Sequence, residues 1–281
     1  MSYPRVQRAA ADNEFYTAAL EQLPGYQQAH ATAEQAEQLL RELISPSMTL
    51  PSPLSTGIVT GEWLDAVAAH RQALSDLEAR RAALIELRDT ARATLASLPV
   101  LYADIMLGEL NAALAPVIST GREICAGLHG ASTPREVLDA GTDAVRAWSN
   151  LAPVVARYAK VRAAQFAVMA EFSDETQMAK STINTDRRAS DLLVANLDEI
   201  SPSWRNPARD YNGNLMWSAP WPADDTEYFV WLVTSDARPW VPTLAQLDQQ
   251  HRDRADPIQG VIATTVIDNP LTTTSPLGAP A

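Results

Sequence analysis

A regular stripe of apolar residues between Trp63 and Leu98 constrains the fold of this chain more than any other feature. Apolar side chains recur there at intervals of three, four or seven residues, which places them along one face of an α-helix. The stripe consists of Leu64, Val67, Leu74, Leu77, Leu84, Leu87, Ala91, Leu95 and Leu98. Charged residues occupy the other faces. The sequence therefore predicts one long amphipathic helix with a single apolar face that can pack against other helices.

All of these residues except Ala91 form the helical seam through which we expect the helix to contact other helices. The seam spans about five heptads, but His70 and Arg81 fall at positions where an ideal coiled coil is apolar. The pattern therefore favours packing inside a helical bundle and self-association in a coiled coil about equally. We interpret His70 as a boundary residue of the seam and not as a metal ligand.

The chain ahead of this stripe divides into two parts. Residues 1–44 read as an N-terminal helical pair, interrupted at Pro24-Gly25 where a helix is hard to continue. Residues 45–60 are rich in Pro and Ser, which predicts an extended, semi-rigid connector.

Residues 61–200 are predicted to form a helical bundle or coiled-coil domain. The segment 100–128 is apolar on more than one side, so we expect it to lie deeper than the stripe before it. Thr133, followed by Pro134 and Glu136, has the pattern of a capping box with proline at the first helical position. A further helix is expected to begin near Ser173 and to end at Ile200.

The character of the chain changes after residue 200, and residues 201–267 are predicted to form a small aromatic-rich module of β or irregular structure. Asn212-Gly213 is typical of a hairpin turn, and residues 228–233 are the best strand candidate. A short helix is expected at 243–254 and another strand at 261–267. Residues 268–281, rich in Thr and Pro, are expected to form an extended tail. The fold class is therefore mainly α, with a small C-terminal Trp-rich module.

Five of the seven tryptophans gather in this module. Large aromatic side chains supply contact area at low entropic cost, so they are common in small cores, in protein interfaces and on sugar-binding platforms. The sequence favours a core, then a protein interface, then a glycan platform. The candidate interaction residues are Trp204, Trp217, Trp221, Trp231 and Trp240.

Charge and composition narrow the class of partner. The net charge is −12 and the 20 arginines are scattered, so the chain should repel nucleic acid and anionic membranes. The N-terminus lacks the apolar core of a signal peptide, and no apolar run is long enough to span a membrane. We therefore expect a protein made in the cytoplasm that binds neither nucleic acid nor membrane.

No catalytic motif stands out in the chain. Phosphate-binding glycine loops, nucleophile elbows and zinc-binding His pairs are missing, and Cys125 lies in an apolar helical stretch typical of a buried structural thiol. His251 and Asp253 are two residues apart and point to different sides of a helix. The sequence therefore predicts no enzyme, no catalytic residues, no cofactor and no metal.

The hypothesis that fits these features best is a structural or assembly protein that forms a homo-oligomer or a larger assembly with protein partners. Arginine greatly outnumbers lysine, which occurs only at Lys160 and Lys180, and this bias is typical of a GC-rich source. A capsid or tail component of an actinobacteriophage virion suits the pattern. The alternatives are a glycan- or protein-binding module at the cell surface and a helical-bundle enzyme whose site is not visible in sequence.

Overall fold

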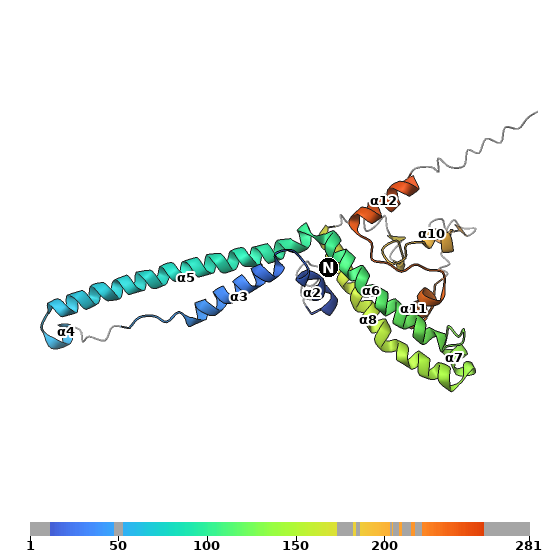
Figure 1. Ribbon diagram of the computed structural model, residues 1–281, viewed down its shortest axis with the longest axis horizontal. Helices are drawn as coiled ribbons and strands as arrows, with labels where there is room; N and C mark the ends of the chain where they lie inside the picture. Colours follow the sequence, from blue (N-terminus) through green and yellow to red (C-terminus); the bar gives the residue numbers. More distant parts are fainter. Residues whose placement is uncertain are drawn as a thin grey trace, which may run out of the picture.

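The computed structural model describes residues 12–47, 53–172, 182–183, 186–202, 204, 208–209, 215–216 and 221–255, and the protein is mainly α-helical. A long arm projects from a head in which the other elements gather (Figure 1). The arm consists of α3 (Tyr26–Glu42) and α5 (Gly61–Leu101). The head is built on the pair α6 (Ala103–Ala126) and α8 (Thr142–Phe172).

The helical pair predicted near the N-terminus is present as α2 (Glu14–Glu21) and α3. Asn13 caps α2 by accepting hydrogen bonds from the backbone N–H groups of Phe15 and Tyr16. Pro24-Gly25 separates the two helices, and Gly25 has a φ of +82°, a left-handed conformation that favours glycine. The turn allows α2 to pack against α6 and α8 while α3 runs out along the arm.

The predicted connector is not wholly extended, because α4 (Pro53–Thr56) forms one helical turn within it. Proline is well tolerated at the first position of a helix, where its missing N–H group would have no partner. From Thr60, whose side chain accepts a hydrogen bond from Trp63 N, α5 then runs through the whole apolar stripe. The long helix predicted over the apolar stripe is confirmed.

A sharp bend joins the arm to the head. α5 continues through Pro99 and ends at Leu101, and α6 begins two residues later at an angle of 70°. No single described helix has the length and apolarity needed to cross a membrane, although α5 and α6 together satisfy those two criteria as a bent pair. Most large apolar side chains of α6, including Met106 and Leu110, are buried in the head, whereas Ile105 is 42% exposed.

The head encloses the core between α6 and α8. The sequence predicts that residues 100–128 lie deeper than the apolar stripe before them, and this is confirmed. α7 (Pro134–Ala140) begins with the predicted capping box, in which Thr133 accepts from Glu136 N and the Glu136 carboxylate accepts from Thr133 N. The most completely buried large apolar side chains are Met106, Leu107, Leu110, Leu114, Leu128, Leu151, Met169, Leu192, Leu197, Phe229 and Leu232.

The strand predicted at 228–233 is wrong, because these residues lie in the helix α11 (Asp225–Thr234). Asp224 caps this helix by accepting from Thr226 N and Glu227 N. A helix that is buried on most sides has a short continuous apolar run, which its sequence pattern does not distinguish from a buried strand. α11 packs closely on α6, where a Cβ atom at Gly121 would lie 2.6 Å from the ring of Phe229.

The continuous helix predicted from Ser173 to Ile200 is also wrong. In the described part of this range, β1 (Thr182–Ile183) pairs antiparallel with β2 (Asp186–Ser190), and only α10 (Leu197–Ile200) is helical. The apolar residues at 192–194 are buried in a turn-rich segment that packs in the head core. Tertiary packing, and not helical periodicity, explains their spacing.

Two smaller predictions agree with the structure in the C-terminal region. β3 (Ala208–Arg209) pairs antiparallel with β4 (Leu215–Met216), as expected for strands on either side of Asn212-Gly213. The predicted short helix is α12 (Leu244–Ala255). The strand expected at 261–267 and the tail at 268–281 lie outside the described residues.

Candidate interaction surface on the helical arm

The two helices of the arm contact each other through alanine. The buried residues of α3 are Ala29, Ala33 and Ala36, and Ala91 is buried on α5. Small side chains let the helices approach closely, but each buries little apolar surface. The arm is therefore held by a thin interface, in contrast to the leucine-rich head.

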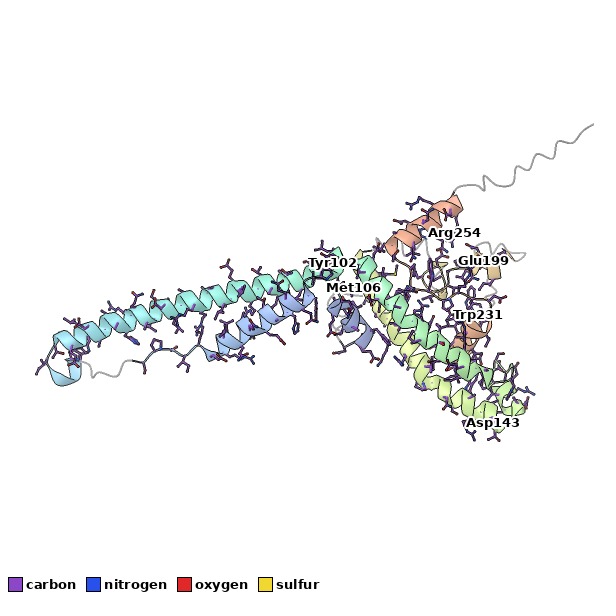
Figure 2. The ribbon with its side chains drawn as sticks, in the orientation of Figure 1. Tyr102, Met106, Asp143, Glu199, Trp231 and Arg254 are labelled. Atoms are coloured by element: carbon purple, nitrogen blue, oxygen red, sulfur yellow. The ribbon has the colours of Figure 1, made fainter. Side chains whose placement is uncertain are left out.

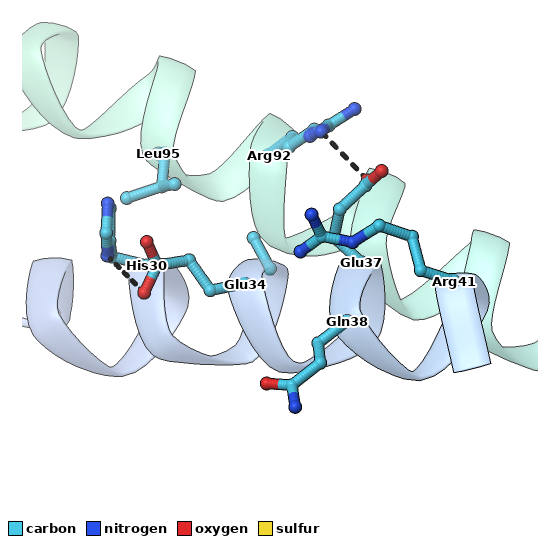
Figure 3. Close-up of a pocket in the computed structure, with 8 residues that line it drawn as sticks. His30, Glu34, Glu37, Gln38, Arg41, Arg92 and Leu95 are labelled. Atoms are coloured by element: carbon cyan, nitrogen blue, oxygen red, sulfur yellow. Dashed lines mark hydrogen bonds and ion pairs between the residues drawn. The ribbon is translucent and has the colours of Figure 1, made fainter.

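An open groove of about 570 Å³ follows this contact, and charged side chains line it (Figure 3). Glu37 of α3 lies 3.2 Å from an Nη atom of Arg92 and 3.6 Å from one of Arg88, both on α5. His30 stacks on Tyr26 and lies 3.6 Å from Glu34. The partly exposed ion pairs of Glu37 with Arg88 and Arg92 help to set the pairing of α3 with α5, although exposed pairs of this kind contribute little stability.

The face of α5 that contacts α3 follows a regular heptad pattern, which we call the α5 seam. Its members are separated alternately by four and three residues. They are Trp63, Val67, His70, Leu74, Leu77, Arg81, Leu84, Arg88, Ala91, Leu95 and Leu98. This pattern differs from the predicted seam, because it includes the polar positions and excludes Leu64 and Leu87.

The structure places the predicted seam residues in three groups. Leu98 is buried next to the head, while Val67, Leu77, Leu84 and Leu95 are half-buried. The exposed residues are Leu64, Leu74 and Leu87, at 55%, 36% and 49% exposure. Leu64 and Leu87 lie on the two flanks of the seam, so the predicted stripe combined core positions with neighbouring surface positions.

α3 covers only the half of the α5 seam that is nearer to the head (Figure 1). Its last contacts are made by Leu39, Glu42 and Leu43, which line a mainly apolar groove of about 430 Å³ with Arg80, Ala83 and Leu84 of α5. From Trp63 to Arg81, a stretch we call the distal seam, no described helix packs along α5 as α3 does. An apolar seam without a covering helix is the main candidate for an interaction surface.

The described tryptophans of the C-terminal region are largely packed inside the head. Trp204 and Trp221 are 5% and 6% exposed, and Trp221 lies 5.7 Å from Trp231 at an angle of 59°. Trp231 and Trp240 are half-buried, and Trp217 lies outside the described residues. Burial supports the core interpretation for Trp204 and Trp221, because a glycan platform needs exposed rings.

A buried ion cluster, which the sequence analysis missed, fixes α12 to the head. Asp191 is fully buried, and its two carboxylate oxygens accept hydrogen bonds of 2.6 and 2.7 Å from Arg254. Arg254 also donates to Asp198, which accepts a second bond from Trp204 Nε1. Burial lowers the pKa of Arg254. Its hydrogen bonds to Asp191 raise the pKa by more than burial lowers it, so the pKa lies above its ordinary value. Figure 2 shows Arg254 on α12.

A second buried polar group ties the same region to α8. Arg162 donates to the carbonyl oxygens of Trp240 and Leu193, and Gln165 donates to that of Leu192. Buried carbonyl groups need such partners. The signal for these residues in the sequence was weak, since nothing local distinguishes the buried Arg162 from the exposed Arg157 and Lys160 of the same helix.

The described residues show no arrangement suited to catalysis on a bound metal. No group of three or more His, Cys, Asp or Glu side chains converges there. Burial raises the pKa of the Cys125 thiol to about 11, so the thiol is protonated and unreactive at neutral pH. His251 lies 4.0 Å from Asp191, not beside Asp253, and Asp191 is already engaged by Arg254.

Comparisons of the chain with protein-family models, curated proteins and solved structures find no match.

Proposed function

We propose that this is a non-enzymatic assembly protein that associates with copies of itself through the distal seam of its arm. One observation carries the proposal: the α5 seam continues past the end of α3, and no described helix packs along that continuation as α3 does. Leu74, in the middle of the continuation, is 36% exposed. The head supplies a folded anchor for the arm.

The distal part of the arm lacks much of the packing that stabilises a long helix in water. Most of the stability of a helix in a protein comes from packing its apolar face, and a long helix whose face is half covered lacks much of that stabilisation. Each apolar square ångström removed from water contributes about 25 cal/mol. Association along the distal seam would supply packing that α3 supplies only near the head.

Light scattering coupled to size-exclusion chromatography tests the proposal on the full chain. The wild-type protein should show a mass above that of the monomer, rising with concentration. Leu74→Glu should abolish it, because the charge enters the seam, whereas the matched change Ser75→Glu on the exposed side of the same turn should leave it unchanged. A monomer mass at every concentration, or equal effects of the two substitutions, would contradict the proposal.

A further inference from the structure

The distal seam has a pattern that suits one particular partner. We infer that it binds the distal seam of a second copy of the chain, with the two α5 helices antiparallel about a twofold axis between Leu74 and Leu77. This inference rests on the proposed function and deepens it by naming the partner, the orientation and the register. Closed pairs of this kind are the commonest form of homo-oligomer.

The order of residues along the seam supports this register. In an antiparallel coiled coil, each seam residue faces a seam residue of the partner helix. Here Leu74 would face Leu77 of the second copy, and Leu77 would face Leu74, which makes an apolar centre. In the next layers on both sides His70 would face Arg81, so the two polar positions of the distal seam face each other and not a leucine. A neutral imidazole nitrogen can accept a hydrogen bond from a guanidinium group.

The flanks of the seam match in the same register. Arg71 would lie beside Glu78 of the second copy, and the twofold axis repeats this pair. Leu64 would lie beside Ile85, and Leu87 beside Ala66. Between Gly61 and Leu98, the exposed large apolar side chains of α5 are Leu64, Leu74, Ile85 and Leu87. One register thus covers every member of that set and pairs opposite charges.

Other arrangements of the two helices set a leucine against a polar residue, or set two like charges against each other. A shift of one heptad in one direction sets Leu74 against His70 and Arg71 against Arg71, and a shift in the other direction sets Leu77 against Arg81 and Glu78 against Glu78. Parallel pairing would set Arg81 against Arg81 in the seam. Like charges at facing positions oppose association, so these arrangements are less stable.

In this register the second helix would meet the end of α3 near Leu84. The apolar groove lined by Leu43, Ala83 and Leu84 lies where α3 ends against α5. Val67 of the second copy would face Leu84 and reach this groove. Each α5 would then be covered first by α3 of its own chain and next by α5 of the second copy, with the two heads at opposite ends.

Charge reversal in full-length chains tests the register. Arg71→Glu alone creates two facing Glu–Glu pairs in a homodimer, and Glu78→Arg alone creates two facing Arg–Arg pairs. Each variant should associate roughly 5- to 30-fold more weakly than wild type at low ionic strength, as expected for two exposed pairs changed from attraction to repulsion. An equimolar mixture of the two variants should recover the dimer mass, because both flanking pairs are again of opposite charge.

The control is Asp65→Arg, which reverses an exposed charge away from the seam and its flanks and should leave association unchanged. The double variant Arg71→Glu with Glu78→Arg should associate as wild type does. If wild type forms an oligomer that Leu74→Glu abolishes, but mixing the single variants gives no recovery, the antiparallel register is overturned while the proposed function stands. A monomeric wild type overturns both.

Discussion

The head and the arm use the same secondary structure with opposite kinds of contact. In the head, α6 and α8 bury large side chains such as Met106, Leu110 and Leu151 to less than 2% exposure. In the arm, α3 and α5 bury the small side chains Ala33, Ala36 and Ala91. Stability therefore concentrates in the head, and the arm keeps partly exposed the apolar side chains through which we propose that it associates. Substitutions in the head and in the arm should therefore differ in how much they lower the free energy of unfolding and in how much of the protein they affect.

Phe229→Ala in the head is expected to have the largest effect. The ring is fully buried between α11 and α6 and contacts Tyr158 edge-on, at 5.4 Å between ring centroids. Its removal should lower the free energy of unfolding by about 3–5 kcal/mol. Alkylation of Cys125, which is protected while the head is folded, should accelerate in parallel. Leu138→Ala, at a residue exposed on the head, is the control and should change neither quantity.

Gly121→Ala sharpens this prediction. The added Cβ atom would lie 2.6 Å from the Phe229 ring, so the substitution should destabilise the wild-type head by about 1–3 kcal/mol. In the Phe229→Ala background the same substitution should have no such penalty, because the ring is gone. Additive effects in this double-mutant cycle would mean that the close approach of α6 and α11 is not maintained in solution.

Arg254→Met should have the next largest effect. It leaves the fully buried Asp191 carboxylate without its forked guanidinium partner, and breaking a buried pair in this way is expected to lower the free energy of unfolding by about 3 kcal/mol. Hydrogen exchange should increase first in α12, which this pair holds on the head. Arg252→Met, which changes an exposed arginine of the same helix, should preserve the protection of α12.

Ala36→Leu should affect the arm alone. Ala36 is 1% exposed between α3 and α5, so a larger side chain must push the helices apart, at an expected loss of about 1–3 kcal/mol. Because the contact of α3 with α5 is separate from the core between α6 and α8, α3 should lose hydrogen-exchange protection while α6 and α8 keep theirs. Loss of protection in the head as well would show that the arm and the head unfold as one unit.

The sequence predicted the arm better than the C-terminal part of the head, for a physical reason. The periodicity of α5 and the cap at Thr133 are local signals, so one segment of chain contains all the information needed. α11 and the segment around Leu192 take their structure from distant partners such as Gly121 and Arg162. The apolar stripe of α5 could be predicted in outline, but only the position of α3 shows along which part of it no described helix packs.

Glu37→Gln should have the smallest effect and tests whether charge sets the pairing within the arm. The substitution removes the ion pairs with Arg88 and Arg92, which are partly exposed, so the loss of stability should be small and visible only at low ionic strength. Salt screens such pairs, and the difference from wild type should therefore vanish near 1 M salt. Glu34→Gln, which affects a contact within α3, is the control and should leave the α3–α5 pairing unchanged. A difference that persists at high salt would mean that Glu37 acts by packing against α5 and not by its charge.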